Sequence, residues 1–256
     1  MCLTPLLILV IGFGSEAVFF GLILVATAIA INEFLNLILS SNKWKERLTG
    51  VLLGSLLAYS IFSGEGFLVL GISTLIIIFL LIFFLVSVRD LTSVVPSLGK
   101  ILVGIFYVGL LLPHFSLIRG MPFGKQWVFF VLVATFMGDT GAYYAGSRLG
   151  KHKLYPKISP GKTIEGSIGG LLGSIVGALI FRKYFLSQLE VYHCVILALG
   201  LGVMGQLGDL CESMLKRSVG VKDSGSLLPG HGGMLDRIDS IIFSAPFLYY
   251  YVLLIL

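Results

Sequence analysis

Residue types suited to chemistry cluster near position 209, within a stretch that is otherwise strongly apolar. Four polar residues spaced at i, i+3, i+4 and i+7 would share one face of a helix; they are Asp209, Glu212, Ser213 and Lys216. Ionisable groups at membrane depth are costly, so they face a cavity or one another. This polar stripe therefore predicts either a site that uses charge or a network of ion pairs along one helix.

A glycine-rich segment, KDSGSLLPGHGGMLDRID, follows at positions 222–239. Glycine lets a backbone approach a ligand closely, which favours a binding loop. Asp236 and Asp239 are three residues apart at the start of a predicted helix, so both carboxylates point to one side, where the helix N-terminus favours negative charge. With Asp209 they predict a site of oxygen ligands, which Mg²⁺ prefers. The structural alternative is that Asp236 caps the helix while Arg237 and Asp239 are surface charges.

A third group of candidates lies upstream, at positions 138–170. Asp139 falls inside an apolar segment, and Lys162 and Thr163 directly precede another one. The string Gly161-Lys162-Thr163 is close to a phosphate loop, but Pro156 occupies the first glycine position of that template. A basic loop that leads into a helix N-terminus still predicts a phosphate site. The alternative is a basic anchor on the cytoplasmic side of a membrane.

Composition indicates the elements that position these residues. The chain has 256 residues, of which 57% are hydrophobic and 12% charged, whereas soluble domains carry about 25% charged residues. We therefore expect an all-α, polytopic integral membrane protein with about nine transmembrane helices. We divide it into N-terminal transmembrane helices, 1–120, and a C-terminal catalytic transmembrane region, 121–256. The expected helices are 3–13, which is short for a span, 17–39, 48–63, 66–88, 101–118, 126–147, 165–185, 191–213 and 238–256.

The loop charges predict the topology. All but four of the 18 Lys and Arg residues lie in the loops 40–47, 89–100, 148–164 and 214–237. The positive-inside rule places these loops in the cytoplasm, so the N-terminus is inside, the C-terminus is outside, and the candidate active site faces the cytoplasm. The net charge of +5 then indicates anionic lipid headgroups as neighbours and no nucleic acid.

The remaining polar residues are less informative. Glu33, at the cytoplasmic end of the second span, is interpreted as a structural hydrogen-bonding or interfacial group. His114, His152 and His193 have no ligand spacing and are expected to be incidental. The three cysteines indicate neither a disulfide framework nor a zinc site.

The motifs resemble those of the phosphatidate cytidylyltransferase family, whose members are also called CDP-diacylglycerol synthases. The upstream blocks Asp139-Thr140-Gly141-Ala142-Tyr143 and Ser159-Pro160-x-Lys162-Thr163-x-Glu165-Gly166 are similar to the family's. So is the long run Ser213-x₂-Lys216-Arg217-x₄-Lys222-Asp223-x-Gly225-x₃-Pro229-x-His231-Gly232-Gly233-x₂-Asp236-Arg237-x-Asp239. The chain departs from the family at its N-terminus, where members usually begin with a basic segment and a full first span.

The resemblance implies the reaction CTP + phosphatidate → CDP-diacylglycerol + pyrophosphate, in phospholipid biosynthesis at the inner (cytoplasmic) membrane of the cell. It implies Mg²⁺ as cofactor, leaves a second cation open, and implies contact with membrane lipid and a homodimer. It assigns catalysis to Lys216, Lys222, Asp223, His231 and Arg237. It assigns substrate binding to Ser159, Lys162, Thr163, Ser213, Gly232 and Gly233. The expected metal ligands are Asp139, Asp209, Asp236 and Asp239.

Two alternatives compete with this interpretation. A related CTP-dependent lipid enzyme, such as a polyprenol kinase, would transfer the γ-phosphoryl group and release CDP instead of pyrophosphate. An ion-coupled transporter would use the buried carboxylates as a cation relay, and it would support flux in sealed vesicles without nucleotide turnover.

Overall fold

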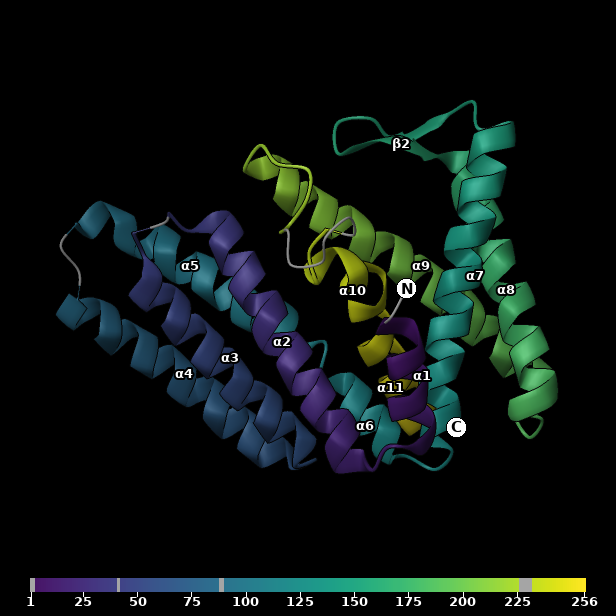
Figure 1. The fold of residues 1–256 in the computed structure, drawn as a ribbon, viewed down its shortest axis with the longest axis horizontal. Coiled ribbons are helices and arrows are strands. Elements are labelled where there is room, and N and C mark those ends of the chain that lie inside the picture. Colours follow the sequence, from purple (N-terminus) through teal and green to yellow (C-terminus); the bar gives the residue numbers. More distant parts are fainter. Residues whose placement is uncertain (1–2, 41, 88–89, 226–231) are drawn as a thin grey trace. The chain divides into compact units, whose positions relative to one another are not determined.

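The computed structural model describes residues 3–40, 42–87, 90–225 and 232–256. Most of these residues are helical, which confirms the expected all-α fold (Figure 1). A short antiparallel hairpin of β1 (Lys153–Tyr155) and β2 (Ser159–Thr163) interrupts the helices. The helices are α1 Leu3–Phe13, α2 Glu16–Ile38, α3 Trp44–Phe62, α4 Gly66–Ser87, η1 Leu91–Ser93, α5 Val94–Gly104, the π-helix η2 Ile105–Leu110, α6 His114–Gly120, α7 Gly124–Leu149, α8 Ile164–Phe185, α9 Val191–Ser218, α10 Leu235–Ile242 and α11 Ser244–Ile255.

The protein is a multi-pass membrane protein. Seven helical stretches of the described chain are long and apolar enough to span a bilayer. The count of about nine is not confirmed, because two of the expected helices fall outside this set. Helix α1 has 11 residues, and the 19-residue α3 carries Lys45, Glu46 and Arg47 near its start. The seven stretches are Glu16–Ile38, Gly66–Ser87, Leu91–Gly120, Gly124–Leu149, Ile164–Phe185, Val191–Ser218 and Leu235–Ile255.

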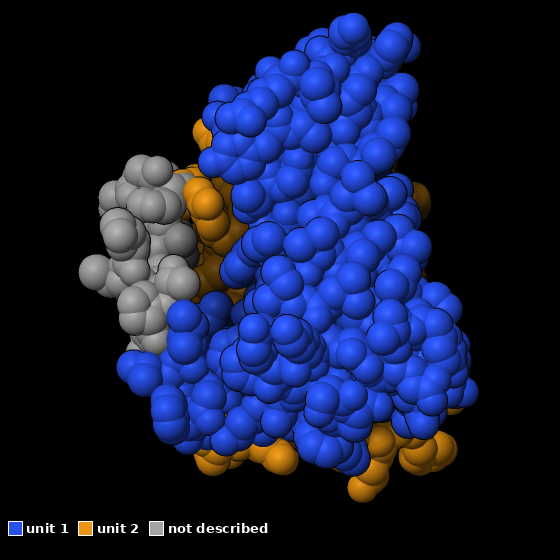
Figure 2. All heavy atoms as spheres, turned by 90° about the vertical axis from the view of Figure 1, so that its right-hand side faces the viewer, with its two compact units in different colours: residues 1–14, 118–222, 238–256 blue, residues 15–117, 223–237 orange. Residues whose placement is uncertain are grey.

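The chain divides into two compact units, coloured separately in Figure 2. Unit 1 consists of Met1–Gly14, Ile118–Lys222 and Ile238–Leu256, and unit 2 consists of Ser15–Leu117 and Asp223–Arg237. The expected boundary at residue 120 separates the N-terminal helices from the catalytic region, and this division stays a prediction.

Unit 2 contains α2 to α5 and η2 around an apolar core. Ser15 caps the start of α2, where its hydroxyl accepts the amide hydrogen of Val18 at 3.3 Å. Helix α3 and η2 cross at two glycines, where a Cβ on Gly109 would lie 2.9 Å from the carbonyl oxygen of Gly54. Glycine at these positions lets the two backbones touch, as small residues do in membrane helix packing.

Unit 1 is built on the pair α7 and α8, which run side by side along their lengths (Figure 1). A Cβ on Gly141 of α7 would overlap the carbonyl oxygen of Gly169 on α8, and one on Gly173 of α8 would overlap that of Met137 on α7. Helix α9 packs on α8. The close approach of these backbones holds the polar residues of α7 and α9 in defined positions.

The contact at Gly141 yields a stability prediction. Gly141→Ala should lower the unfolding temperature of the protein in detergent micelles, because a helix backbone cannot move aside as a flexible side chain can. Overpacking of this kind costs about 1–3 kcal/mol. Gly71→Ala in α4 is the matched control, since a Cβ there meets nothing within 4 Å, and alanine favours a helix by about 1 kcal/mol over glycine. Equal unfolding temperatures for Gly141→Ala and the wild type would contradict the prediction.

Candidate active site

Three carboxylates of unit 1 come together from three helices. Asp139 lies on α7, Asp209 on α9 and Asp239 on α10. The charges of Asp139 and Asp239 each interact unfavourably with that of Asp209. These three residues were expected to be metal ligands together with Asp236, and the structure brings Asp139 and Asp239 close enough to Asp209 for their charges to interact with it.

A close helix contact places Asp239 beside Asp209. The carbonyl oxygen of Asp239 lies against Gly208, where any Cβ would overlap it. One oxygen of the Asp239 carboxylate accepts the amide hydrogen of Ser240 at 2.6 Å. The hydroxyl of Ser240 donates to the same oxygen at 3.2 Å.

Two lysines supply positive charge to this cluster. Lys162, on β2, forms an ion pair with Asp209, with 2.7 Å between Nζ and Oδ2, and it also interacts electrostatically with Asp139. Lys216, on α9, interacts with Asp239. Lys162 therefore reaches the carboxylates from the hairpin.

The polar stripe predicted on α9 forms as expected. The hydroxyl of Ser213 donates to Oδ1 of Asp209 at 3.3 Å, and Nζ of Lys216 lies 2.5 Å from Oε2 of Glu212. Glu212 is fully buried. The ion pair between Glu212 and Lys216 confirms the interpretation as ion pairs along the helix, while Asp209 pairs with the hairpin. A functional role for the stripe stays a prediction.

The hairpin itself is anchored at the start of α8. The hydroxyl of Thr163 accepts the amide hydrogen of Gly166 at 3.1 Å and caps the helix. Glu165 accepts the amide hydrogens of Lys151 and His152 at 3.1 and 3.2 Å and pairs with the His152 ring. His152, expected to be incidental, thus helps to hold the hairpin that carries Lys162.

In unit 2, Asp236 hydrogen-bonds to residues on both sides of the glycine-rich loop. Its carboxylate accepts the amide hydrogen of Ser224 at 3.0 Å and that of Gly233 at 2.8 Å. These donors precede Asp236 in the chain, so the residue is not the helix cap that the sequence analysis kept as an alternative. Gly232 has φ = +80°, a left-handed conformation that favours glycine.

The structure says less about the remaining candidate residues. Lys222, Asp223 and Arg237 are exposed, and Ser159 is half-buried on β2. His231 lies outside the described residues. The functional roles of all these residues remain predictions, although the structure shows that Thr163 and Asp236 also have structural tasks.

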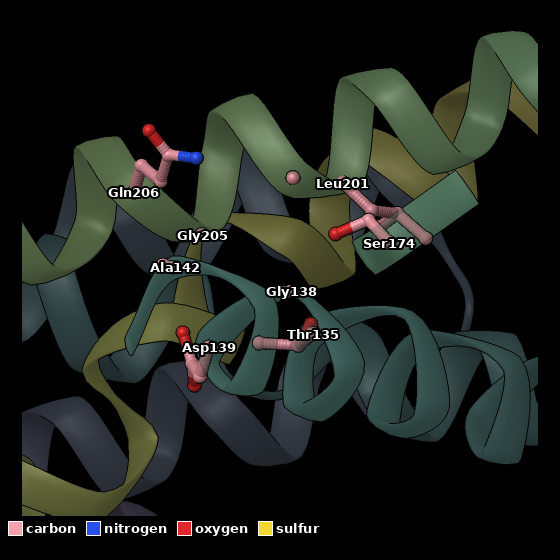
Figure 3. A pocket seen from close by; sticks show the side chains of 9 residues that line it. Thr135, Gly138, Asp139, Ala142, Ser174, Leu201, Gly205 and Gln206 are labelled. Atoms are coloured by element: carbon pink, nitrogen blue, oxygen red, sulfur yellow. The ribbon is translucent and has the colours of Figure 1, made fainter. Parts of the chain in front are cut away.

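A small cavity, lined in part by Asp139, lies between α7, α8 and α9 (Figure 3). It leaves ≈ 20 Å³ for the centre of a water molecule, which is enough for about one buried water. The hydroxyls of Thr135 and Ser174 line it, and both are buried without a hydrogen-bond partner among the described residues. Sequence reasoning did not identify these hydroxyls, because a single Ser or Thr in a membrane helix usually bonds its own backbone.

The chain matches the cytidylyltransferase family over residues 1–255, and it belongs to this family. The phosphatidate cytidylyltransferase of Bacillus subtilis is 42% identical over 193 residues, which cover 75% of this chain and 71% of that protein. The protein of the same name from Staphylococcus epidermidis is 44% identical over 147 residues, and the one from Staphylococcus aureus is 45% identical over 147 residues. Each of these two matches spans 57% of this chain and 56% of the staphylococcal protein, a little over half its length.

The cap at Thr163 yields a second prediction. Thr163→Ala should lower the unfolding temperature in micelles, because loss of an N-cap hydroxyl costs about 1 kcal/mol. Thr163→Ser keeps a hydroxyl and should unfold at nearly the wild-type temperature. If the alanine and serine variants unfold at the same temperature, the hydroxyl does not stabilise α8.

Proposed function

We propose that the protein transfers the cytidylyl group of CTP to phosphatidate and releases CDP-diacylglycerol and pyrophosphate. The observation that carries the proposal is the cluster of Asp139, Asp209 and Asp239 with the Lys162 ammonium group, in a family whose relatives are named phosphatidate cytidylyltransferases. This cluster lies among apolar helices of unit 1, which suits an enzyme whose substrate is a membrane lipid.

The chemistry needs positioning and charge neutralisation rather than a strong base. A phosphate oxygen of phosphatidate is already anionic at neutral pH. It attacks the α-phosphorus of CTP, and the bond from that phosphorus to the β-phosphate oxygen breaks as pyrophosphate leaves. Such transfers are accelerated mainly by holding the reactants in line and stabilising the developing negative charge.

The basic residues of the site suit the phosphates. Lys162 stands at the end of a glycine-containing hairpin strand, directly before the N-terminus of α8, where backbone amides favour an anion. The positive charge of Lys216 interacts favourably with the Asp239 carboxylate. We assign phosphate binding to both lysines, with Arg237 and Lys222 as further candidates on exposed segments.

The carboxylates suit Mg²⁺ as the cofactor. No group of three or more His, Cys, Asp or Glu side chains is placed to hold a metal ion within the part of the chain that the structure describes. Mg²⁺ usually takes only one or two protein carboxylates and completes its shell with water and substrate phosphates. Asp209 and Asp239 fit that role, with Asp139 as a further candidate, because their mutual repulsion is relieved by a cation. When bound, Mg²⁺ would neutralise charge on the phosphates.

Asp236 is harder to assign to the same ion. Its oxygens accept two backbone amides of the loop in unit 2. Its role as a metal ligand therefore remains a prediction from the resemblance, as do a second cation and a homodimer.

The reaction is tested with purified protein, labelled CTP, phosphatidate and Mg²⁺ in micelles. Equal amounts of CDP-diacylglycerol and pyrophosphate should form, and a chelator should abolish both. Asp209→Asn and Asp239→Asn should each lower turnover by at least about 100-fold, the loss typical of removing one charge-stabilising group. Glu65→Gln, an exposed carboxylate of unit 2, is the control and should retain activity.

A separate measurement shows whether these carboxylates bind the ion. Without substrates, Mg²⁺ should raise the unfolding temperature of the wild type and of Glu65→Gln, but not that of Asp209→Asn or Asp239→Asn. Release of CDP without pyrophosphate would instead establish γ-phosphoryl transfer. Ion flux in sealed vesicles with no nucleotide turnover would establish a transporter. Either result would overturn the proposal.

We place the site on the cytoplasmic face of the inner membrane, on the strength of the loop charges. In a background without the natural cysteines, Lys157→Cys in the hairpin should react with an impermeant thiol reagent only after cells are opened. Ser187→Cys, between α8 and α9, should react in intact cells. Labelling of both positions from outside would contradict this orientation.

A further inference from the structure

Glu33, a carboxylate far in sequence from every candidate site residue, contacts the glycine-rich loop in unit 2. Oε2 of Glu33 on α2 accepts the amide hydrogen of Leu235 at 2.9 Å, across 202 positions of the chain. Glu33 is 7% exposed, and Leu235 is 1% exposed. Burying a charged side chain inside an apolar bundle costs free energy, so such a residue is a candidate for a specific role.

Glu33 caps the N-terminus of α10. This helix begins at Leu235, and the first amides of a helix lack partners within it. The residue before it, Met234, has no side-chain oxygen to accept an amide hydrogen. Glu33 supplies that oxygen from α2, and its negative charge suits the positive end of the helix.

The Glu33 carboxylate also contacts both flanks of the loop. A Cβ on Gly225 would lie 2.9 Å from Oε1, and a Cβ on Gly233 would lie 2.6 Å from Oε2. The two glycines therefore leave room for this carboxylate. Asp236 bonds the same flanks through the amides of Ser224 and Gly233, so two carboxylates together determine how the loop meets α10.

We propose that Glu33 is a positioning residue for the reaction: through Leu235 it orients the first turn of α10, and hence the carboxylates that this helix carries. The inference rests on the proposed function. It differs from a purely structural role, because the helix start that Glu33 caps bears Asp236 and, one turn later, Asp239. A small displacement of groups that bind reactants can cost about 100-fold in rate.

Three variants test the proposal with the full-length protein in micelles. Glu33→Ala removes the acceptor, and kcat should fall by about 100-fold while the KM for CTP changes by less than about threefold. Glu33→Gln retains an oxygen that can accept the Leu235 amide hydrogen, and it should restore most of kcat. Glu65→Ala, an exposed carboxylate of the same unit, is the control and should match the wild type.

Hydrogen exchange provides a readout that does not depend on turnover. The peptide that begins α10 should exchange faster in Glu33→Ala than in the wild type, with protection restored in Glu33→Gln and peptides of α3 unchanged in all variants. Wild-type kcat in Glu33→Ala would overturn the inference, as would a folded Glu33→Gln that is as inactive as the alanine variant, since the charge itself would then be required. An inactive wild type would instead refute the proposed function, so the two failures are distinguishable.

Discussion

Like-charged carboxylates in an apolar bundle repel one another and lose hydration, and this cost determines how the polar part of unit 1 is arranged. The penalty for burying an ion is several kcal/mol, and it is offset only by well-placed countercharges and hydrogen bonds. Asp209 receives both, from Lys162 on the hairpin and from Ser213 one helical turn away. Glu212 is buried against Lys216. Asp139 and Asp239 add further negative charge beside Asp209, which the proposed Mg²⁺ would offset.

Contact between helix backbones makes this arrangement possible. A carboxylate reaches only a few ångströms from its own helix, so α7, α9 and α10 must lie close together before their carboxylates can interact. Gly208 admits the carbonyl of Asp239 beside Asp209, and Gly141 admits the backbone of α8 against α7. The abundance of glycine, 32 of 256 residues, thus contributes to the site although glycine has no functional group.

The glycine-rich loop is held by a different set of interactions. In unit 2, Asp236 and Glu33 accept backbone amides from the residues that flank the loop and begin α10. A backbone amide within an apolar region must find an acceptor, and here the acceptors are carboxylates rather than other backbone groups. The described residues on either side of the loop, and the start of α10, are therefore held by side chains from α2 and α10.

The sequence by itself determined the class of structure and the list of candidate residues. Hydrophobic segments of membrane length specify helices regardless of their neighbours, because a backbone in lipid must satisfy its own hydrogen bonds. The i, i+4 spacing of Asp209 with Ser213 and of Glu212 with Lys216 likewise specifies one helical face, and both contacts along α9 follow from it. The expected count of about nine spans is not confirmed, since α1 is short and α3 carries three charges near its start.

Only the tertiary structure decided which candidates share an environment. Asp236 and Asp239 have the same residue type and lie one turn apart, yet Asp236 bonds loop amides while Asp239 interacts with Asp209. Lys162 and Asp209 are distant in sequence but form an ion pair, and Glu33 caps a helix 202 positions away. Sequence spacing reports neighbours within one helix. Contacts between helices depend on how their surfaces pack, which the spacing within each helix does not contain.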